Sequence, residues 1–182
     1  MVGSSSHRTH SCTSSLAVLL FAGVAVAPTA HSAEADTRTN FFDDPFSQVS
    51  SGLKNCPTPL GPFYTPAEVR SQMHGRLERG TSCWLARRCK DSNAYRYDKA
   101  IAPEVRKALD GVPGIRRSSV WVTVQRRWVY LQGCVPTRDL ARRLERAAKA
   151  VPDVETVVPD LMTGTRGKAP YPLATNQEKD KE

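Results

Sequence analysis

Two short segments alternate apolar with polar or aromatic residues, and valine holds most of the apolar positions. They are residues 120–125 and 129–135, separated by the basic pair Arg126-Arg127. Such period-two alternation predicts two strands joined as a hairpin. Thr137 can then cap a helix that runs to about residue 150. Its apolar side chains recur at helical spacing, at Leu140, Leu144, Ala147, Ala148 and Val151.

A short apolar run ending at Leu161 predicts a returning strand, and residues 102–109 predict a helix before the hairpin. The expected class is α+β: a small three-stranded mixed sheet with two helices on one face, in the order α-β-β-α-β. The helix should form a right-handed crossover that joins the strand at 129–135 to a parallel strand ending at Leu161. The antiparallel strand at 120–125 can lie between these two strands. This is the layout of a small binding module, with little room for a catalytic centre.

A helical extension is expected over residues 65–99, ahead of this unit. Thr65, Pro66 and Glu68 have the spacing of a helix start with a capping box. A narrow apolar stripe should follow, at Val69, Met73 and Leu77. Gly80 can end the helix, and Cys83 and Cys89 can then close a short loop.

The remaining segments predict no packed structure. Residues 34–64 are rich in Ser, Asn, Asp and Pro, which predicts a flexible leader. Residues 162–182 are rich in Gly, Pro and charge, which predicts a disordered tail.

Residues 1–33 resemble an export signal. An apolar run from Leu16 to Ala27 follows a polar stretch with one cation, Arg8, and precedes small residues. The run is short for a membrane span and suits a signal peptide, with cleavage after Ser32 or soon after it. Cys12 precedes the apolar run, so it cannot be a lipid-modified cysteine. We therefore expect a periplasmic protein that is not a lipoprotein.

Removal of such a signal leaves four cysteines, Cys56, Cys83, Cys89 and Cys134. An even count in an exported chain predicts two disulfides, with three possible connectivities. The spacings suit neither a zinc site nor a redox-active CxxC pair.

The strand at 128–135 suggests which cysteines pair. Trp128, Tyr130 and Gln132 share a face with Cys134, opposite the aliphatic residues. A bond from Cys134 to an N-terminal cysteine would draw the preceding segment across this aromatic face. We favour Cys56–Cys134 with Cys83–Cys89; left open, the face would instead be a docking patch for protein or membrane.

The chain is basic, with 26 Lys and Arg against 18 Asp and Glu. The helix after residue 137 concentrates part of this charge on one face. Its cations are Arg138, Arg142, Arg143, Arg146 and Lys149. Such a stripe suits an anionic membrane surface, where each cation contributes on the order of 1 kcal/mol. The alternative is an ordinary solvated helix face. Nucleic acid is not expected as a partner, because export separates the chain from it.

Catalytic constellations are not evident in the sequence. His74 is the only histidine beyond the expected signal, and no Gly-x-Ser-x-Gly motif accompanies it. The carboxylate pair Asp43-Asp44 lies in the expected flexible leader, where nothing would hold it at a catalytic separation. We expect a non-enzymatic protein without cofactor or metal.

Residues 100–161 resemble one copy of the BON domain of bacterial osmotic-shock and nodulation-related envelope proteins. The resemblance lies in the alternating valines before Val129-x-Leu131-x-Gly133-x-Val135, the Ala-rich helix, and the closing Val154-x-x-Val157 with Leu161. Arg126-Arg127 and Asp153 stand where the family often has glycine, so the hairpin turn should differ in detail.

The resemblance implies a non-enzymatic module that binds anionic phospholipid or another envelope component, in envelope integrity or osmotic-stress tolerance. The alternative is a protein–protein adaptor in an envelope or secretion assembly.

Overall fold

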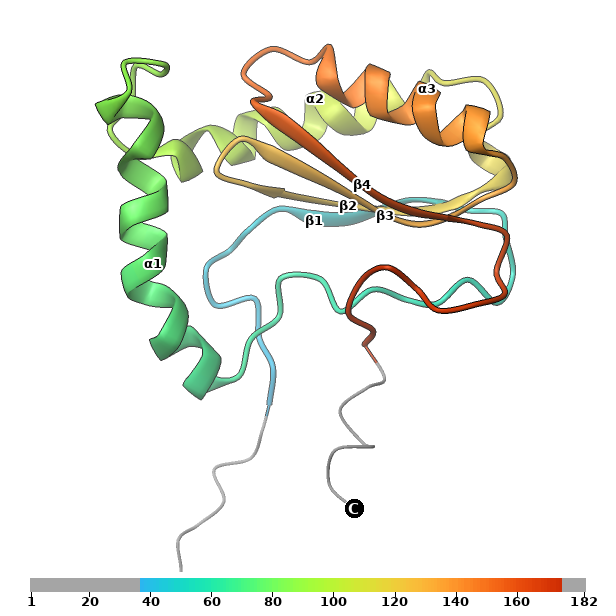
Figure 1. Cartoon of the computed structure of the whole chain (residues 1–182), viewed down its shortest axis with the longest axis horizontal. Helices are drawn as coiled ribbons and strands as arrows, with labels where there is room; N and C mark the ends of the chain where they lie inside the picture. Colours follow the sequence, from blue (N-terminus) through green and yellow to red (C-terminus); the bar gives the residue numbers. More distant parts are fainter. Residues whose placement is uncertain (1–36, 175–182) are drawn as a thin grey trace, which may run out of the picture. The chain divides into compact units, whose positions relative to one another are not determined.

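The computed structural model describes residues 37–174, and every structural statement below concerns this part of the chain (Figure 1). The expected signal peptide at 1–33 lies outside it, as do residues 34–36 and 175–182. The elements in chain order are β1 (Phe46–Ser51), α1 (Pro66–Leu85), the 3-10 helix η1 (Ala94–Tyr97), α2 (Asp98–Asp110), the 3-10 helix η2 (Ile115–Arg117), β2 (Ser119–Gln125), β3 (Trp128–Val135), α3 (Arg138–Lys149) and β4 (Thr156–Thr163).

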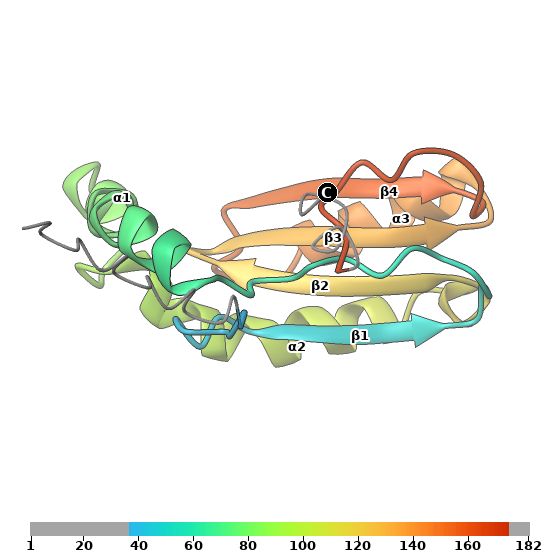
Figure 2. The same cartoon turned by 90° about the horizontal axis from the view of Figure 1, so that it is seen from below.

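The fold is α+β, but its sheet has four strands in the described chain, not the expected three. The strand order is β1-β2-β3-β4, as Figure 2 shows from below. The pairs β1–β2 and β2–β3 are antiparallel, and β3–β4 is parallel. The expected parallel pairing across the α3 crossover is therefore confirmed. The place between these two strands is not used, because β3 pairs directly with β4 and β2 lies on its other side.

The additional strand, β1, comes from the segment expected to be a flexible leader. Its sequence, FSQVSS, has no apolar alternation, and its register with β2 shifts between Gln48 and Ser50. Only Val49 packs against the core, from a partly buried position. The strand forms because β2 offers an open edge of backbone donors and acceptors, which β1 satisfies.

The core lies between the sheet and the two helices α2 and α3, which cover one face (Figure 1). Val129 and Leu131 on β3 meet Leu109 of α2 and Leu144 of α3 in one cluster, and all four are fully buried. Each contributes roughly 1.5–3 kcal/mol by leaving water. The expected placement of two helices over the valine face is confirmed. The first helix begins at Asp98, earlier than expected.

The arginine pair predicts a hairpin turn that differs in detail from the family's glycine-containing turn. The turn between β2 and β3 is nevertheless a two-residue turn. Arg126 and Arg127 both have positive φ, 48° and 69°, as a type I′ turn requires. Their backbone N–H groups donate to the two carboxylate oxygens of Asp98, at 2.6 and 2.7 Å. Asp98 thus stabilises a backbone conformation that arginine alone would disfavour. The remaining departure, Asp153, also has positive φ, 65°.

Helix α1 begins as expected and ends later. Thr65 and Glu68 form the reciprocal capping box. Gly80 does not end the helix but lies buried inside it. A Cβ there would stand 3.0 Å from the Asn93 side chain and 3.3 Å from the Tyr95 ring. Glycine at this position therefore allows α1 to pack closely against η1.

The expected apolar stripe of α1 does not face the core. Val69 is buried, but Met73 is 51% exposed and Leu77 is 71% exposed. The predicted stripe is therefore covered at Val69 and open to solvent at Met73 and Leu77.

A buried ion pair connects α1 to the leader and to β2. Asp44 is 4% exposed and accepts two hydrogen bonds from Arg76, at 2.7 and 2.9 Å. Gln125 donates to the same carboxylate at 2.6 Å. The Arg76 guanidinium also stacks on Phe42 and Tyr95, at 4.0 and 3.9 Å from the ring centroids. The leader is thus held in place here.

Two irregular segments, one before α1 and one after β4, cover the face of the sheet opposite the helices (Figure 2). Cys56 and Cys134 form one disulfide, and Cys83 and Cys89 form the other. This is the pairing that we favoured, and it fastens the segment after β1 to β3.

The segment after β4 also packs here, which corrects the expected tail from residue 162. Met162 and Thr163 belong to β4. Tyr171 is 5% exposed, and its hydroxyl donates to the Pro57 carbonyl at 2.8 Å. An isolated bridge joins Pro59 to Leu173.

Candidate functional site

The basic face of α3 is the first candidate surface. The helix is capped by the Thr137 side chain, which accepts from the Leu140 N–H at 3.2 Å. Leu140, Leu144 and Ala148 face the core. The opposite side of the helix therefore faces outward, and the expected cations of the site lie along it.

The five cations of α3 are not equivalent. Arg138, Arg142, Arg146 and Lys149 are exposed, and Arg143 is partly buried. Arg142 and Arg143 both pair with Asp139, at 3.6 and 2.9 Å.

Lys149 donates to the carbonyl oxygen of Glu155. Within the described residues, Arg138 and Arg146 form no salt bridge. Two carboxylates on α3, Asp139 and Glu145, reduce the helix charge from +5 to +3. Arg138 and Arg146 are therefore the cations most available to an external anion.

A groove runs beside this face, between α2 and α3, and sequence reasoning missed it. Its volume is about 580 Å³, within the range of small-molecule sites. Small apolar side chains line it: Ala108, Val112, Pro113, Ala147 and Val151. Lys107, Arg143 and the acidic Glu104 also line it. The repeated alanines on the facing helices were the only sequence signal, and alanine alone does not distinguish a groove from close helix packing.

Arg143 connects the groove to the basic face. Its guanidinium donates to Asp139 on its own helix and to the Pro113 carbonyl at 3.0 Å across the groove. The combination of an apolar channel with cations beside it can accommodate an apolar chain that carries an anionic end.

The aromatic face of β3, the second candidate, is largely covered. Trp121 is 9% exposed, and Tyr130 is partly buried. Burial raises the pKa of the Tyr130 hydroxyl. Trp128 is stacked by Arg126, whose guanidinium carbon lies 3.7 Å from the ring centroid. This face therefore contributes to the packing of the molecule and offers no broad open aromatic patch.

The candidate catalytic groups are not assembled. The His74 side chain is 86% exposed and lies 3.3 Å from the Glu78 carboxylate. Asp43 pairs with Lys99 in an exposed contact, while Asp44 is occupied by Arg76. Within residues 37–174 no group of three or more His, Cys, Asp or Glu residues could hold a metal ion.

Asp98 is a second buried carboxylate besides Asp44, and it was not singled out in the sequence. Burial raises its pKa to about 6, against the opposing effect of the two N–H donors from the hairpin turn. The charges of Asp44 and Arg76 act on it in opposite directions. Its oxygens are fully engaged with the turn, so its role is structural.

The family comparison matches the helix-backed sheet. Residues 97–164 match the BON domain family, in a single copy. The match begins at η1 and includes β4 to its end, so α1 and β1 lie outside it. No curated protein and no solved structure matches the chain. None of the helices within residues 37–174 has the length and apolar character needed to cross a membrane.

Proposed function

Residues 97–164 form a BON domain, and from this premise we propose that the chain is a periplasmic protein that binds anionic phospholipid at the membrane surface. BON domains are non-catalytic binding modules associated with the cell envelope and with osmotic stress. The role we assign is the maintenance of envelope integrity under such stress, without enzymatic activity. The residues proposed to contact lipid are those of the α3 face: Arg138, Arg142, Arg143, Arg146 and Lys149.

The observation that carries this proposal is the set of exposed cations on α3, a helix that also lines an apolar groove. Arg138 and Arg146 are exposed and have no carboxylate partner in the described chain. Arg143 and Ala147 of the same helix line the groove between α2 and α3. An anionic headgroup can meet the cations while apolar parts of the lipid contact the groove. Electrostatic binding of this kind weakens as salt screens the charges.

Co-sedimentation with vesicles of phosphatidylglycerol and phosphatidylcholine tests the proposal. The double substitution Arg138→Glu/Arg146→Glu should weaken binding by roughly 2 kcal/mol or more, about thirty-fold, because each cation contributes on the order of 1 kcal/mol. Its circular dichroism should be unchanged, because both side chains are exposed.

Arg166→Glu/Lys168→Glu provides the charge-matched control. Both residues are exposed and lie after β4, outside the helix layer. This control should bind as the parent protein does. Equal loss in both variants would mean that net charge, and not the α3 face, governs binding.

A protein–protein adaptor remains the second candidate. Apolar side chains exposed on α1 favour it, notably Met73 and Leu77, because such side chains are common in protein interfaces. Recovery of one envelope protein at high salt, by a chain that ignores anionic vesicles, would favour the adaptor over lipid binding.

A further inference from the structure

The last turn of α1 exposes two large apolar side chains. Trp84 is 48% exposed and Leu85 is 70% exposed. They adjoin the loop that ends at Cys89, outside the region that matches the BON family. Exposed tryptophan and leucine side by side are unusual on a water-facing surface, and such a pair indicates a contact site.

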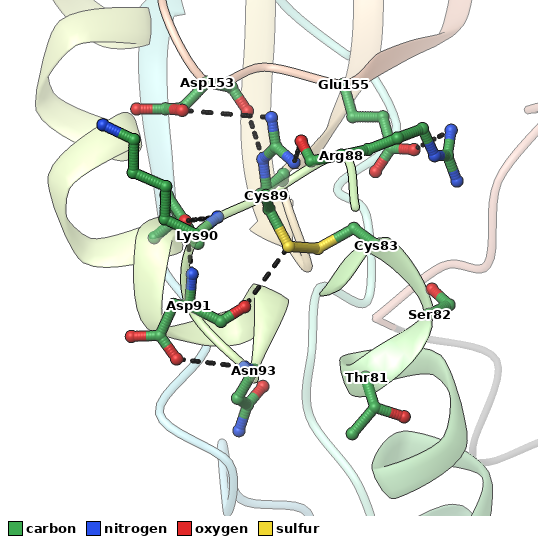
Figure 3. The surroundings of a disulfide bond; sticks show 12 residues. Thr81, Ser82, Cys83, Arg88, Cys89, Lys90, Asp91, Asn93, Asp153 and Glu155 are labelled. Carbon is green, nitrogen blue, oxygen red and sulfur yellow. Dashed lines mark hydrogen bonds and ion pairs between the residues drawn. A yellow bond between two sulfur atoms is a disulfide. The ribbon is translucent and has the colours of Figure 1, made fainter. Parts of the chain in front are cut away.

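The disulfide holds these two side chains outward. Cys83 is 1% exposed, so the sulfur bridge occupies the inner position at this end of the helix. The backbone closes the loop as well, because the Arg88 N–H donates to the Cys83 carbonyl at 2.8 Å. Figure 3 shows the bridge between Cys83 at the end of α1 and Cys89 in the loop. A loop fixed in this way loses little conformational entropy when it binds a surface.

Three cations follow the two apolar residues along the chain. The loop and the residue after it contain Arg87, Arg88 and Lys90, with no carboxylate among residues 83–90. Arg88 pairs with Glu155 at 2.8 Å, whereas Arg87 and Lys90 form no salt bridge in the described chain. Tryptophan and leucine flanked by cations is the composition of segments that lie at the interface of an anionic bilayer.

The loop is continuous with the basic face of α3. Glu155 receives Arg88 of the loop on its carboxylate and Lys149 of α3 on its carbonyl oxygen. Arg127 also reaches the Arg88 carbonyl, at 3.4 Å. Figure 1 shows the C-terminal end of α1 on the side of the sheet that carries α2 and α3. One flat surface can therefore meet both.

Charge argues against a second copy of the chain as the occupant. Residues 66–90 contain six Lys and Arg residues and two Glu residues, a net charge of +4. Two such segments would repel each other across an interface. An anionic bilayer meets both features, because its headgroups attract the cations and its interface accepts the apolar side chains.

We propose that the Cys83–Cys89 loop is a membrane anchor, in which Trp84 and Leu85 enter the headgroup region of an anionic bilayer. This rests on the proposed lipid binding and adds its apolar component. The α3 face supplies attraction that salt screens, and the loop supplies insertion that salt does not screen.

Vesicle binding at high salt separates the two components. Trp84→Ser/Leu85→Ser should still bind phosphatidylglycerol vesicles at about 0.05 M salt, but its binding at about 0.5 M should fall by at least about ten-fold relative to the parent. The matched control is Met73→Ser/Leu77→Ser, which removes two exposed apolar side chains from the same helix away from the loop. The control should retain binding at both salt concentrations.

Quenching of tryptophan fluorescence by brominated lipid tests directly whether the Trp84 side chain enters the bilayer. The parent protein should lose tryptophan fluorescence on such vesicles, and Trp84→Phe should lose much less of its own, because Trp121 and Trp128 are not in the loop. Phenylalanine preserves the apolar contact, so this variant should still bind.

The outcomes distinguish the two proposals. Absence of parent binding to anionic vesicles even at low salt would overturn both. Low-salt binding without quenching of Trp84, or a salt-resistant fraction that survives in Trp84→Ser/Leu85→Ser, would overturn the anchor and leave the α3 proposal standing. Equal losses in the control and loop variants would also overturn it, because the whole helix face would then be responsible.

Discussion

The two faces of the sheet are covered in different ways. On one face, α2 and α3 bury aliphatic side chains in a continuous cluster. On the other, irregular chain before α1 and after β4 lies across the strands, secured by Cys56–Cys134 and by Tyr171. Helices satisfy their own backbone hydrogen bonds, so side-chain packing alone can secure them. Irregular segments do not, and they depend on a covalent link and specific polar contacts. We therefore expect the free energy of unfolding to depend on side-chain volume at the first face and on the Cys56–Cys134 disulfide at the second.

Truncation in the helix-covered core should have the largest effect. Leu144 is fully buried between α3 and the sheet. Leu144→Ala should lower the free energy of unfolding by about 2–5 kcal/mol, because it removes buried surface and leaves a cavity. Urea denaturation measures this loss. Arg146→Ala on the exposed side of the same helix should change it by less than about 0.5 kcal/mol, and similar losses in both would contradict the assigned helix orientation.

Removal of the cross-link tests the other face. Cys56→Ser/Cys134→Ser should lower the free energy of unfolding by about 2–4 kcal/mol, since the bond joins residues 78 positions apart. The comparison variant is Cys83→Ser/Cys89→Ser, whose bond spans only 6 positions. Its cost should be about 2 kcal/mol smaller, because a shorter loop restricts the unfolded chain less. A greater cost for the short loop would show that the crossing segment holds without its disulfide.

Asp98 lies where the extension meets the BON domain. Its ionisation should make the free energy of unfolding depend on pH. Its pKa is raised by burial from 3.8 to about 6, so the folded state holds this proton more tightly than the unfolded state does. The stabilisation is complete below about pH 4 and is lost as pH rises through about 6, a change of about 3 kcal/mol. The difference in unfolding free energy between the parent and Asp98→Asn, measured by urea denaturation from pH 4 to 7, isolates this carboxyl from the others.

The sign of that difference is the test. The parent should lose stability relative to Asp98→Asn as pH rises, because asparagine does not titrate. If the parent instead gains stability relative to Asp98→Asn as pH rises, the two N–H donors of the turn stabilise the charged form more than burial penalises it.

Substitution on the exposed face of α1 should have the smallest effect on stability. Leu77 is 71% exposed, so Leu77→Ser should change the free energy of unfolding by less than about 0.5 kcal/mol. Val69 is buried at the beginning of the same apolar stripe, so Val69→Ser should lower the free energy of unfolding several times more. Thermal melts of the two variants would separate the covered from the uncovered part of this helix; equal losses would mean that the face of Leu77 is packed.

The helix-backed unit was predictable because its signals are local. The alternation at 120–135 and the helical spacing at Leu140 and Leu144 identify the strands and the α3 core face without knowledge of neighbours. The capping box at Thr65 is equally local. The cysteine pairing followed from the face on which Cys134 lies, since that face needed cover.

The errors share another cause, because each depended on a distant partner. The strand β1 has a polar sequence and exists because β2 has an open edge. The turn at Arg126 adopts positive φ because Asp98, 28 residues earlier, accepts its N–H. Tyr171 is buried by the segment around Pro57. In the candidate site, the cations of α3 were visible in the sequence, whereas their pairing with Asp139 and the adjoining groove were not.

What the sequence determined by itself is the set of elements whose apolar residues repeat at a regular spacing, and with them the BON domain. Periodic burial is a property of the chain at short range, and hydrophobic free energy acts on each such segment independently of its exact neighbours. Tertiary structure alone decided which apolar faces remain open, as on α1, and which polar segments become ordered, as in β1 and around Tyr171. Those outcomes depend on partners brought together by folding, because hydrogen bonds, ion pairs and the exclusion of water by packing act only between groups that are close in space.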